Sequence, residues 1–259
     1  MTRFIAGLLI WSAVAAAPCG AAPVAWKVLK PGVEYAAIPI ASGQPLHVVR
    51  VDPARATLVA ATASETGTEP QTAGQWCRAS HLSVAINLGM FNADHRTHTG
   101  YLRTGRHVNS AEWNAYKSVL AVRPRSAQWF DLEGSIPVTT LDQYEIVVQN
   151  LRLIARPGKN VWAANDRKWS EAALAIDSSH RLLFIFSRAP YTMRDFNALL
   201  LSLPLGIESA MHLEGGPEAS LSVHVGSFNL DLCGSYETGF MENDRNGVQW
   251  PIPNVLGVR

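Results

Sequence analysis

The chain has 259 residues, a formal net charge of +1, 47% hydrophobic residues and 17% charged residues. The charged fraction is below the roughly 25% of an average soluble domain, and the chain is long enough to bury a large core. This composition excludes an intrinsically disordered chain and a strongly basic nucleic-acid-binding protein, so we expect no nucleic acid among its partners.

Residues 1–22 have the three regions of a secretory signal peptide. Arg3 precedes an apolar run over residues 4–17, and the small residues 18–22 follow. The run is shorter than the roughly 20 residues that a membrane-spanning helix needs. We therefore expect cleavage, a periplasmic or secreted protein, and no stable membrane insertion after cleavage. Cys19 is an alternative lipidation site, but the proline before it favours simple cleavage.

Cleavage leaves two cysteines, Cys77 and Cys233, in a compartment where disulfides persist. The two can pair, or Cys77 can be a small buried residue of a short helix over residues 72–78. The sequence has no zinc-binding cysteine cluster. His95 and His98 have the spacing of metal ligands but lack a third ligand nearby, so we expect no metal site, and the sequence identifies no cofactor.

Short runs rich in β-branched residues recur between turn residues along the rest of the chain. They predict strands at residues 46–51, 57–61, 84–87, 119–122, 144–149, 173–177, 182–187 and 210–213. Residues 178–181 predict a hairpin turn, and a helix capped by Thr192 should run to Leu203, before Pro204. We find no internal repeat or linker. The pattern predicts an α+β fold, with residues 23–259 as a single sheet-rich domain and a few flanking helices.

Two segments place polar residues and glycines directly after apolar strands, where a ligand can approach the backbone closely. The candidate residues of the first segment are Asn87, Gly89, Phe91 and Asn92. Those of the second segment are Glu214, Gly215, Gly216, Glu218 and Ser220. Between the two segments lie Gln149 and the adjacent bases Arg167 and Lys168.

Together, these residues resemble the phosphodiester glycosidase family. The first segment matches the family's asparagine, small residues and aromatic residue, and the second matches its acid, glycines and serine. The resemblance covers roughly residues 80–225, and residues 253–258 look like the family's closing strand. This sequence departs from the family pattern in having Glu214 in place of the commoner aspartate, and Glu218 where small hydroxyl residues are usual.

The resemblance implies a hydrolase that cleaves a glycosyl phosphodiester or a related glycosidic bond in carbohydrate of the cell envelope or the extracellular space. Glu214 and Glu218 would then act as the general acid and as the base or nucleophile. Arg167 and Lys168 would contact the phosphate, and because they are adjacent only one of them should reach it. The amides of Asn87 and Gln149 would orient sugar hydroxyls. The remaining substrate-binding candidates are Gly89, Phe91, Asn92, Gly215, Gly216 and Ser220.

Each candidate also has a purely structural interpretation. Glu218 can cap a short helix, Asn87 can close an Asx-turn, and the bases at 167 and 168 can lie in a solvated loop. The alternative function is a non-catalytic periplasmic saccharide-binding protein. The turn-rich residues 226–247 can form either a loop over the site or a capping element. We predict that Asn87, Gln149, one of the two bases and Glu214 converge on one cleft, and a structure with Asn87 and Glu214 on opposite faces of the domain would exclude this site.

Overall fold

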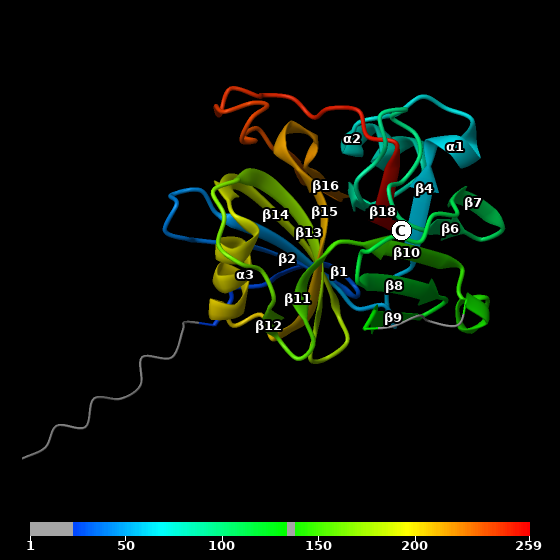
Figure 1. Cartoon of the computed structure of the whole chain (residues 1–259). Coiled ribbons are helices and arrows are strands. Elements are labelled where there is room, and N and C mark those ends of the chain that lie inside the picture. The colour runs from blue at the N-terminus through cyan, green and yellow to red at the C-terminus, as the bar shows by residue number, and fades with distance from the viewer. Residues whose placement is uncertain (1–22, 134–137) are drawn as a thin grey trace, which may run out of the picture.

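The computed structural model describes residues 23–133 and 138–259. The expected signal peptide, residues 1–22, lies outside the described residues. Among the helices of the described chain, none has the length and apolar character needed to cross a membrane. Three antiparallel β-sheets account for most of the fold (Figure 1).

The largest sheet has eight strands. In spatial order these are β1 (Lys27–Lys30), β2 (Val33–Ile38), β3 (Leu46–Val51), β14 (Leu182–Tyr191), β13 (Trp169–Asp177), β15 (Ile207–Gly215), β11 (Arg152–Ala155) and β12 (Lys159–Asn160). The predicted turn over residues 178–181 joins β13 to β14, which pair antiparallel. β13 also pairs with β15, so the central strands of this sheet are buried on both faces.

The two smaller sheets have five strands each. One consists of β7 (His107–Ser110), β6 (Leu102–Thr104), β10 (Ile146–Asn150), β8 (Ser118–Arg123) and β9 (Ser126–Asp131). The other consists of β17 (Phe228–Cys233), β16 (Ser220–Val225), β5 (Val84–Asn87), β18 (Asn254–Val258) and β4 (Leu58–Thr62). The main core lies between the three sheets, where Phe184, Val148 and Ile86 each contribute from a different sheet.

Helices cover the outer faces of two sheets. They are α1 (Ala63–Thr66), α2 (Ala73–Ala79) and α3 (Met193–Ser202), with 3₁₀ turns η1 (Val138–Leu141) and η2 (Gly216–Glu218). The hydroxyl of Thr192 accepts a hydrogen bond from the backbone N–H of Asp195, which confirms the predicted cap of α3. Met193, Phe196 and Leu200 of α3 pack on the large sheet. The predicted sheet-rich fold with few helices is thus confirmed.

The eight predicted strands are all present: β8, β13, β14 and β15 are longer than predicted, β3 and β5 have the predicted bounds, and β4 and β10 are shifted by one or two residues. Prediction missed β17, although its residues alternate between apolar and polar and between partly buried and exposed, the pattern of a strand with one face in solvent. Within the described residues, Cys77 and Cys233 do not form a disulfide. Cys77 is instead buried on α2, as expected for the alternative of a small core residue.

Candidate active site

A cavity of about 370 Å³ lies where the ends of β13 and β15 meet several loops. It is lined by Met90, Leu151, Trp162, Asn165, Arg167, Trp169, Met193, His212, Glu214, Gly215, Glu218 and Glu237. The lining combines three carboxyl groups and a histidine with aromatic and aliphatic side chains. This combination of an apolar wall and a few convergent ionisable groups is typical of a site for a small polar ligand.

The end of β15 is bulged where it carries the first carboxyl group. Ala172 pairs with Glu214 while the next residue, Ala173, pairs with His212, so Leu213 is an extra residue in β15. A bulge bends its strand and redirects the side chains around it. β15 then passes directly into the turn η2, which ends at Glu218 and brings the second carboxyl group to the same cavity.

Asn87 holds this turn from the neighbouring sheet. Its Nδ2 donates to the backbone carbonyl of Glu218 (3.0 Å), and its Oδ1 accepts from the backbone N–H of Ser220 (2.8 Å). Gly216 has a positive φ of 63°, and a Cβ there would collide with the carboxylate of Glu237. A residue without a side chain is therefore required at position 216 for Glu237 to approach η2.

Glu214 is only 9% exposed. Burial raises the pKa of its carboxyl group from the ordinary 4.5 to about 8. The charge of His212 and a hydrogen bond from the Gly215 N–H (3.1 Å) oppose this rise, whereas the charges of Glu218 and Glu237 add to it. Glu214 is therefore mostly protonated at neutral pH, the state that a general acid needs.

Glu218 is less enclosed than Glu214. Burial and then the neighbouring charge of Glu237 raise the pKa of Glu218, and His95 acts in the opposite direction. The charge of Glu218 is one of the causes that raise the pKa of Glu214, so ionisation of one of these two carboxyl groups disfavours ionisation of the other. The site can thus hold protonated and ionised carboxyl groups together.

Behind this group, His212 is held by a buried carboxylate from β13. Its Nδ1 donates to Oε1 of Glu171 (2.5 Å), and the indole Nε1 of Trp169 donates to Oε2 (2.6 Å). Burial alone would lower the pKa of His212, but the charge and hydrogen bond of Glu171, followed by the charges of Glu214 and Glu237, raise it. These interactions favour the protonated form of the His212 imidazole.

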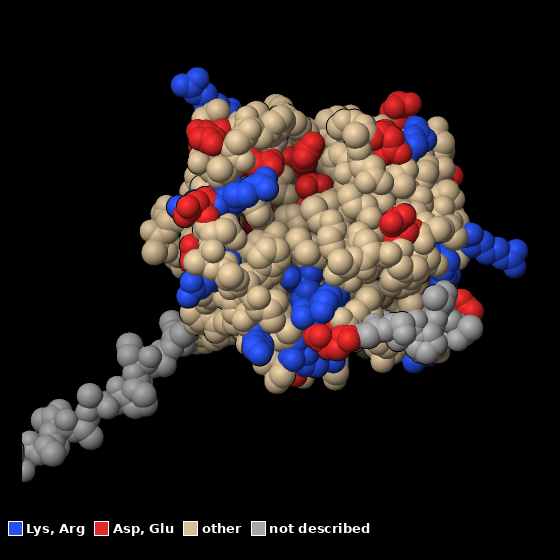
Figure 2. Space-filling model, in the orientation of Figure 1, with Lys and Arg blue, Asp and Glu red and all other residues tan. Residues whose placement is uncertain are grey.

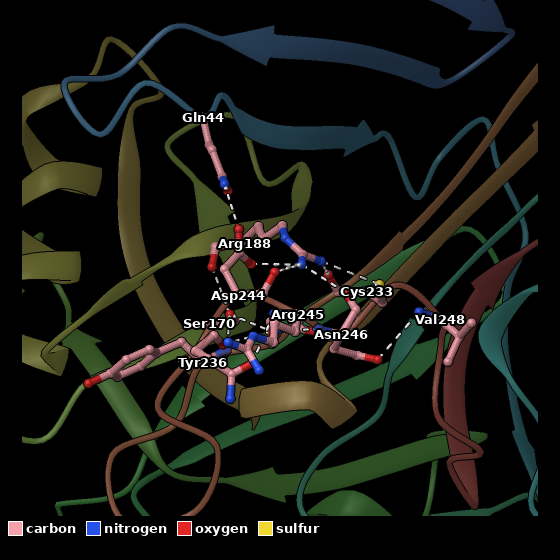
Figure 3. A network of polar contacts seen from close by, with 12 residues as sticks. Gln44, Ser170, Arg188, Cys233, Tyr236, Asp244, Arg245, Asn246 and Val248 are labelled. Atoms are coloured by element: carbon pink, nitrogen blue, oxygen red, sulfur yellow. Dashed lines mark hydrogen bonds and ion pairs between the residues drawn. The ribbon is translucent and has the colours of Figure 1, made fainter.

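The loop after β17 brings Glu237 to the cavity and is fastened to the large sheet at two points (Figure 3). Ser170 Oγ accepts from the backbone N–H of Tyr236 (3.2 Å) and donates to the carbonyl of Arg188 (2.7 Å). The guanidinium of Arg188 forms an ion pair with Asp244 (2.7 Å) and donates to backbone carbonyls of the loop. Of residues 226–247, which were expected to form a loop over the site or a capping element, residues 228–233 instead form the strand β17, and the loop that follows reaches the site at Glu237.

A sequence model of the phosphodiester glycosidases matches residues 80–259. The chain belongs to the phosphodiester glycosidase family. The resemblance that the two glycine-bearing segments indicated is confirmed, and the match extends through β18 to the last residue. A comparison with curated proteins finds no match.

Solved structures with a similar fold include that of a zebrafish enzyme. It is the catalytic domain of N-acetylglucosamine-1-phosphodiester alpha-N-acetylglucosaminidase, auto-inhibited by its pro-peptide. The two structures have a TM-score of 0.61 and 13% sequence identity, and the match covers 90% of this chain and 84% of that chain. A hypothetical protein from Synechocystis has a TM-score of 0.56 at 16% identity, with 87% of this chain and 61% of that chain covered. At these identities the likeness concerns the fold alone.

Four of the residues that the phosphodiester glycosidase resemblance selected lie at the cavity: Glu214, Glu218, Gly215 and Arg167. Lys168 does not line it, so only one of the two adjacent bases reaches the site. The expected convergence of Asn87 and Gln149 on this cavity does not occur. The amide of Asn87 is occupied by η2, and that of Gln149 is buried in hydrogen bonds to the backbone of Tyr101, Asn114 and Tyr116.

The other selected residues do not line the cavity. Phe91 packs against the apolar cluster to which α2 contributes, and its ring contacts the ring of His95. Asn92 lines a separate surface cavity with Asn109 and Asn114. Gly89 lies so close to Asn150 and His98 that a Cβ would collide with both. Gly216 makes room for Glu237, and Ser220 is fully buried.

Eight residues that line the cavity were not among the selected candidates: Met90, Leu151, Trp162, Asn165, Trp169, Met193, His212 and Glu237. One signal was present, because His212 precedes Glu214 by only two residues in the same segment. In the sequence, Glu171 stood out only as an acid close to the expected bases Arg167 and Lys168. Among the described residues, no cluster of three or more His, Cys, Asp or Glu side chains is arranged to hold a metal ion.

Proposed function

We propose that this protein is an exported hydrolase that cleaves a glycosyl phosphodiester, or a related glycosidic bond, in carbohydrate of the cell envelope or the extracellular space. One observation carries the proposal: a carboxyl group with its pKa raised to about 8 shares a cavity with two further carboxyl groups. Glycoside hydrolysis needs such a protonated acid beside an ionised carboxylate. Membership of the phosphodiester glycosidase family supports the same reaction class.

In the proposed reaction, Glu214 is the general acid. The bond between the anomeric carbon and the phosphate oxygen breaks, and Glu214 gives its proton to that oxygen as the phosphate monoester leaves. Glu218, when ionised, accepts a proton from the water whose oxygen bonds to the anomeric carbon. The products are a free sugar and a phosphate monoester, and Glu214 is then ionised and Glu218 protonated until solvent exchanges the protons.

A phosphodiester in this acidic cavity needs a cationic partner, and the lining offers the guanidinium of Arg167. Arg167 lines the cavity and can donate to phosphate oxygens, the geometry that a guanidinium favours. His212 also lines the cavity, and its contact with Glu171 favours the protonated imidazole. Glu171 and Trp169 act as positioning residues in this scheme, because they fix the imidazole.

The test uses a panel of methyl diesters of sugar 1-phosphates, including N-acetylglucosamine 1-phosphate, the unit in the name of the zebrafish enzyme. We expect release of free sugar by the wild type, and a loss of turnover of about 10²–10⁴-fold in Glu214→Gln with ligand binding retained. Glu69→Gln is the control, since Glu69 is 92% exposed. Binding without turnover by the wild type would instead identify a saccharide-binding protein.

Export has its own test. Cleavage should remove Arg3 and the apolar run over residues 4–17, and give a mature chain that starts between Pro18 and Val24 when the protein is isolated from its native host. N-terminal sequencing reads this directly. A mature chain that begins with a lipid-modified Cys19 would instead indicate a membrane-anchored lipoprotein.

A further inference from the structure

A second cavity, of about 320 Å³, adjoins the candidate active site. Its lining is Ala115, Lys117, Leu151, Arg152, Val161, Trp162 and Ala163, and we call it the basic subsite. Leu151 and Trp162 line both cavities, so the two are neighbouring compartments of one cleft. Figure 2 shows acidic atoms gathered near the upper middle of this face and basic atoms below them. The cleft thus has an acidic end and a basic end.

The basic end has more cations than counter-ions. Arg152 and Lys117 both pair with Glu133, with Lys117 Nζ 3.9 Å from its carboxylate. Glu133 is 69% exposed, and the hydrogen bond and charge of Arg152, then the charges of Lys117 and Lys159, lower its pKa. Three basic side chains therefore share one carboxylate that solvent surrounds, and a second anion can approach them without displacing a buried partner.

Arg152 is prepared for such an anion. Its side chain is 11% exposed, so little freedom remains to be lost when a ligand binds. Of its guanidinium nitrogens, only Nη1 donates to a described group, Glu133, and Nε is buried without a partner in the described residues. A partly dehydrated guanidinium with unused donor capacity is a strong site for a carboxylate or phosphate.

Trp162 separates the two compartments and is itself held in place. Its indole Nε1 donates to the backbone carbonyl of Arg152 (2.8 Å), and its backbone N–H donates to Oδ1 of Asn160 (3.2 Å). Beside it, Val161 is 41% exposed. A fixed aromatic side chain and an exposed aliphatic one offer an apolar surface for a sugar ring, and the basic side chains lie next to it.

From these observations, and resting on the proposed function, we propose that the basic subsite binds the acidic group of a charged sugar that adjoins the scissile bond. The acidic group is a carboxylate or a phosphate ester, and Trp162 is the surface on which the sugar packs. The substrate class is therefore an acidic saccharide that is held at both ends of the cleft, with the bond to be cleaved at Glu214 and the acidic group at Lys117 and Arg152.

The test compares glycosyl phosphodiesters in which either sugar is glucose, glucuronic acid or glucose 6-phosphate. At low ionic strength we expect kcat/KM to be at least about tenfold higher for an acidic sugar than for glucose in one of the two positions. Lys117→Gln should lower this ratio by several-fold and Arg152→Gln by about tenfold. Lys117 is 52% exposed, so its replacement leaves folding intact if the Arg152 variant does not fold. Arg106→Gln, on an exposed turn, is the charge-matched control.

Two results would overturn the basic subsite and leave the proposed function standing. The first is an equal kcat/KM for acidic and neutral sugars. The second is an unchanged ratio of these kcat/KM values in Lys117→Gln and in Arg152→Gln, provided that the Arg152 variant folds. In the opposite case the proposed function fails and the basic subsite stands. Calorimetric titration of Glu214→Gln with glucuronic acid and with glucose 6-phosphate identifies this case. It holds if the wild type hydrolyses no diester but these acids bind in a Lys117-dependent manner. The two ligands also distinguish a carboxylate from a phosphate.

Discussion

Replacing Glu214 with glutamine should remove activity and at the same time stabilise the fold above pH 5. The folded chain holds this carboxyl group protonated up to about pH 8, whereas in the unfolded chain it ionises near 4.5. Between these values the folded state binds one more proton than the unfolded state, so the free energy of unfolding falls as pH rises. The difference between a pKa of 4.5 and one of about 8 corresponds to an upper limit of about 5 kcal/mol.

Glutamine keeps an oxygen for the Gly215 N–H and carries no charge, so Glu214→Gln should lose this pH-dependent cost. We expect urea unfolding at pH 4.5 to give similar midpoints for wild type and variant. At pH 8 the variant's midpoint should be higher, by up to about 2 M for a slope of about 2–3 kcal/mol per M. Glu69→Gln should shift neither midpoint appreciably. An equal difference between wild type and Glu214→Gln at both pH values would refute the argument.

Three further predictions concern charges around the site and in the core. Glu237→Gln removes a negative charge that raises the pKa of Glu214. The alkaline limb of the pH–rate profile, which should lie near pH 8 in the wild type, should therefore move to lower pH, and an unmoved limb would exclude Glu214 as the titrating acid. Glu171→Gln leaves the buried His212 without its counter-ion, so it should lower the free energy of unfolding by about 3–5 kcal/mol. Chemical denaturation at pH 6 measures this loss, and Glu69→Gln is the control that should not change it. Burial lowers the pKa of His98 to about 4, so the stability that its neutral form contributes is present above pH 6.5 and lost as pH falls toward 4; His98→Gln should flatten that part of the stability curve measured by urea unfolding.

The sequence by itself determined the local structure and the family. Alternating and β-branched runs locate the central strands, and Thr192 followed by apolar residues at helical spacing locates α3. The segment around Glu214 carries the family's pattern of an acid and two glycines, and the family match includes it. These features depend on residues that are close together in the chain, so a single sequence is enough to reveal them.

Only the tertiary structure decided which polar groups face the cavity. Asn87 follows an apolar strand, as a ligand-binding residue would, yet its amide is occupied by η2, 131 residues away. Glu171 and His212 meet through the pairing of β13 with β15, and Glu237 arrives on a loop whose destination its own sequence does not indicate. The physical reason is that a side chain's partners depend on strand register, bulges and loop packing. These are set by contacts between residues far apart in the chain, and no local pattern encodes them.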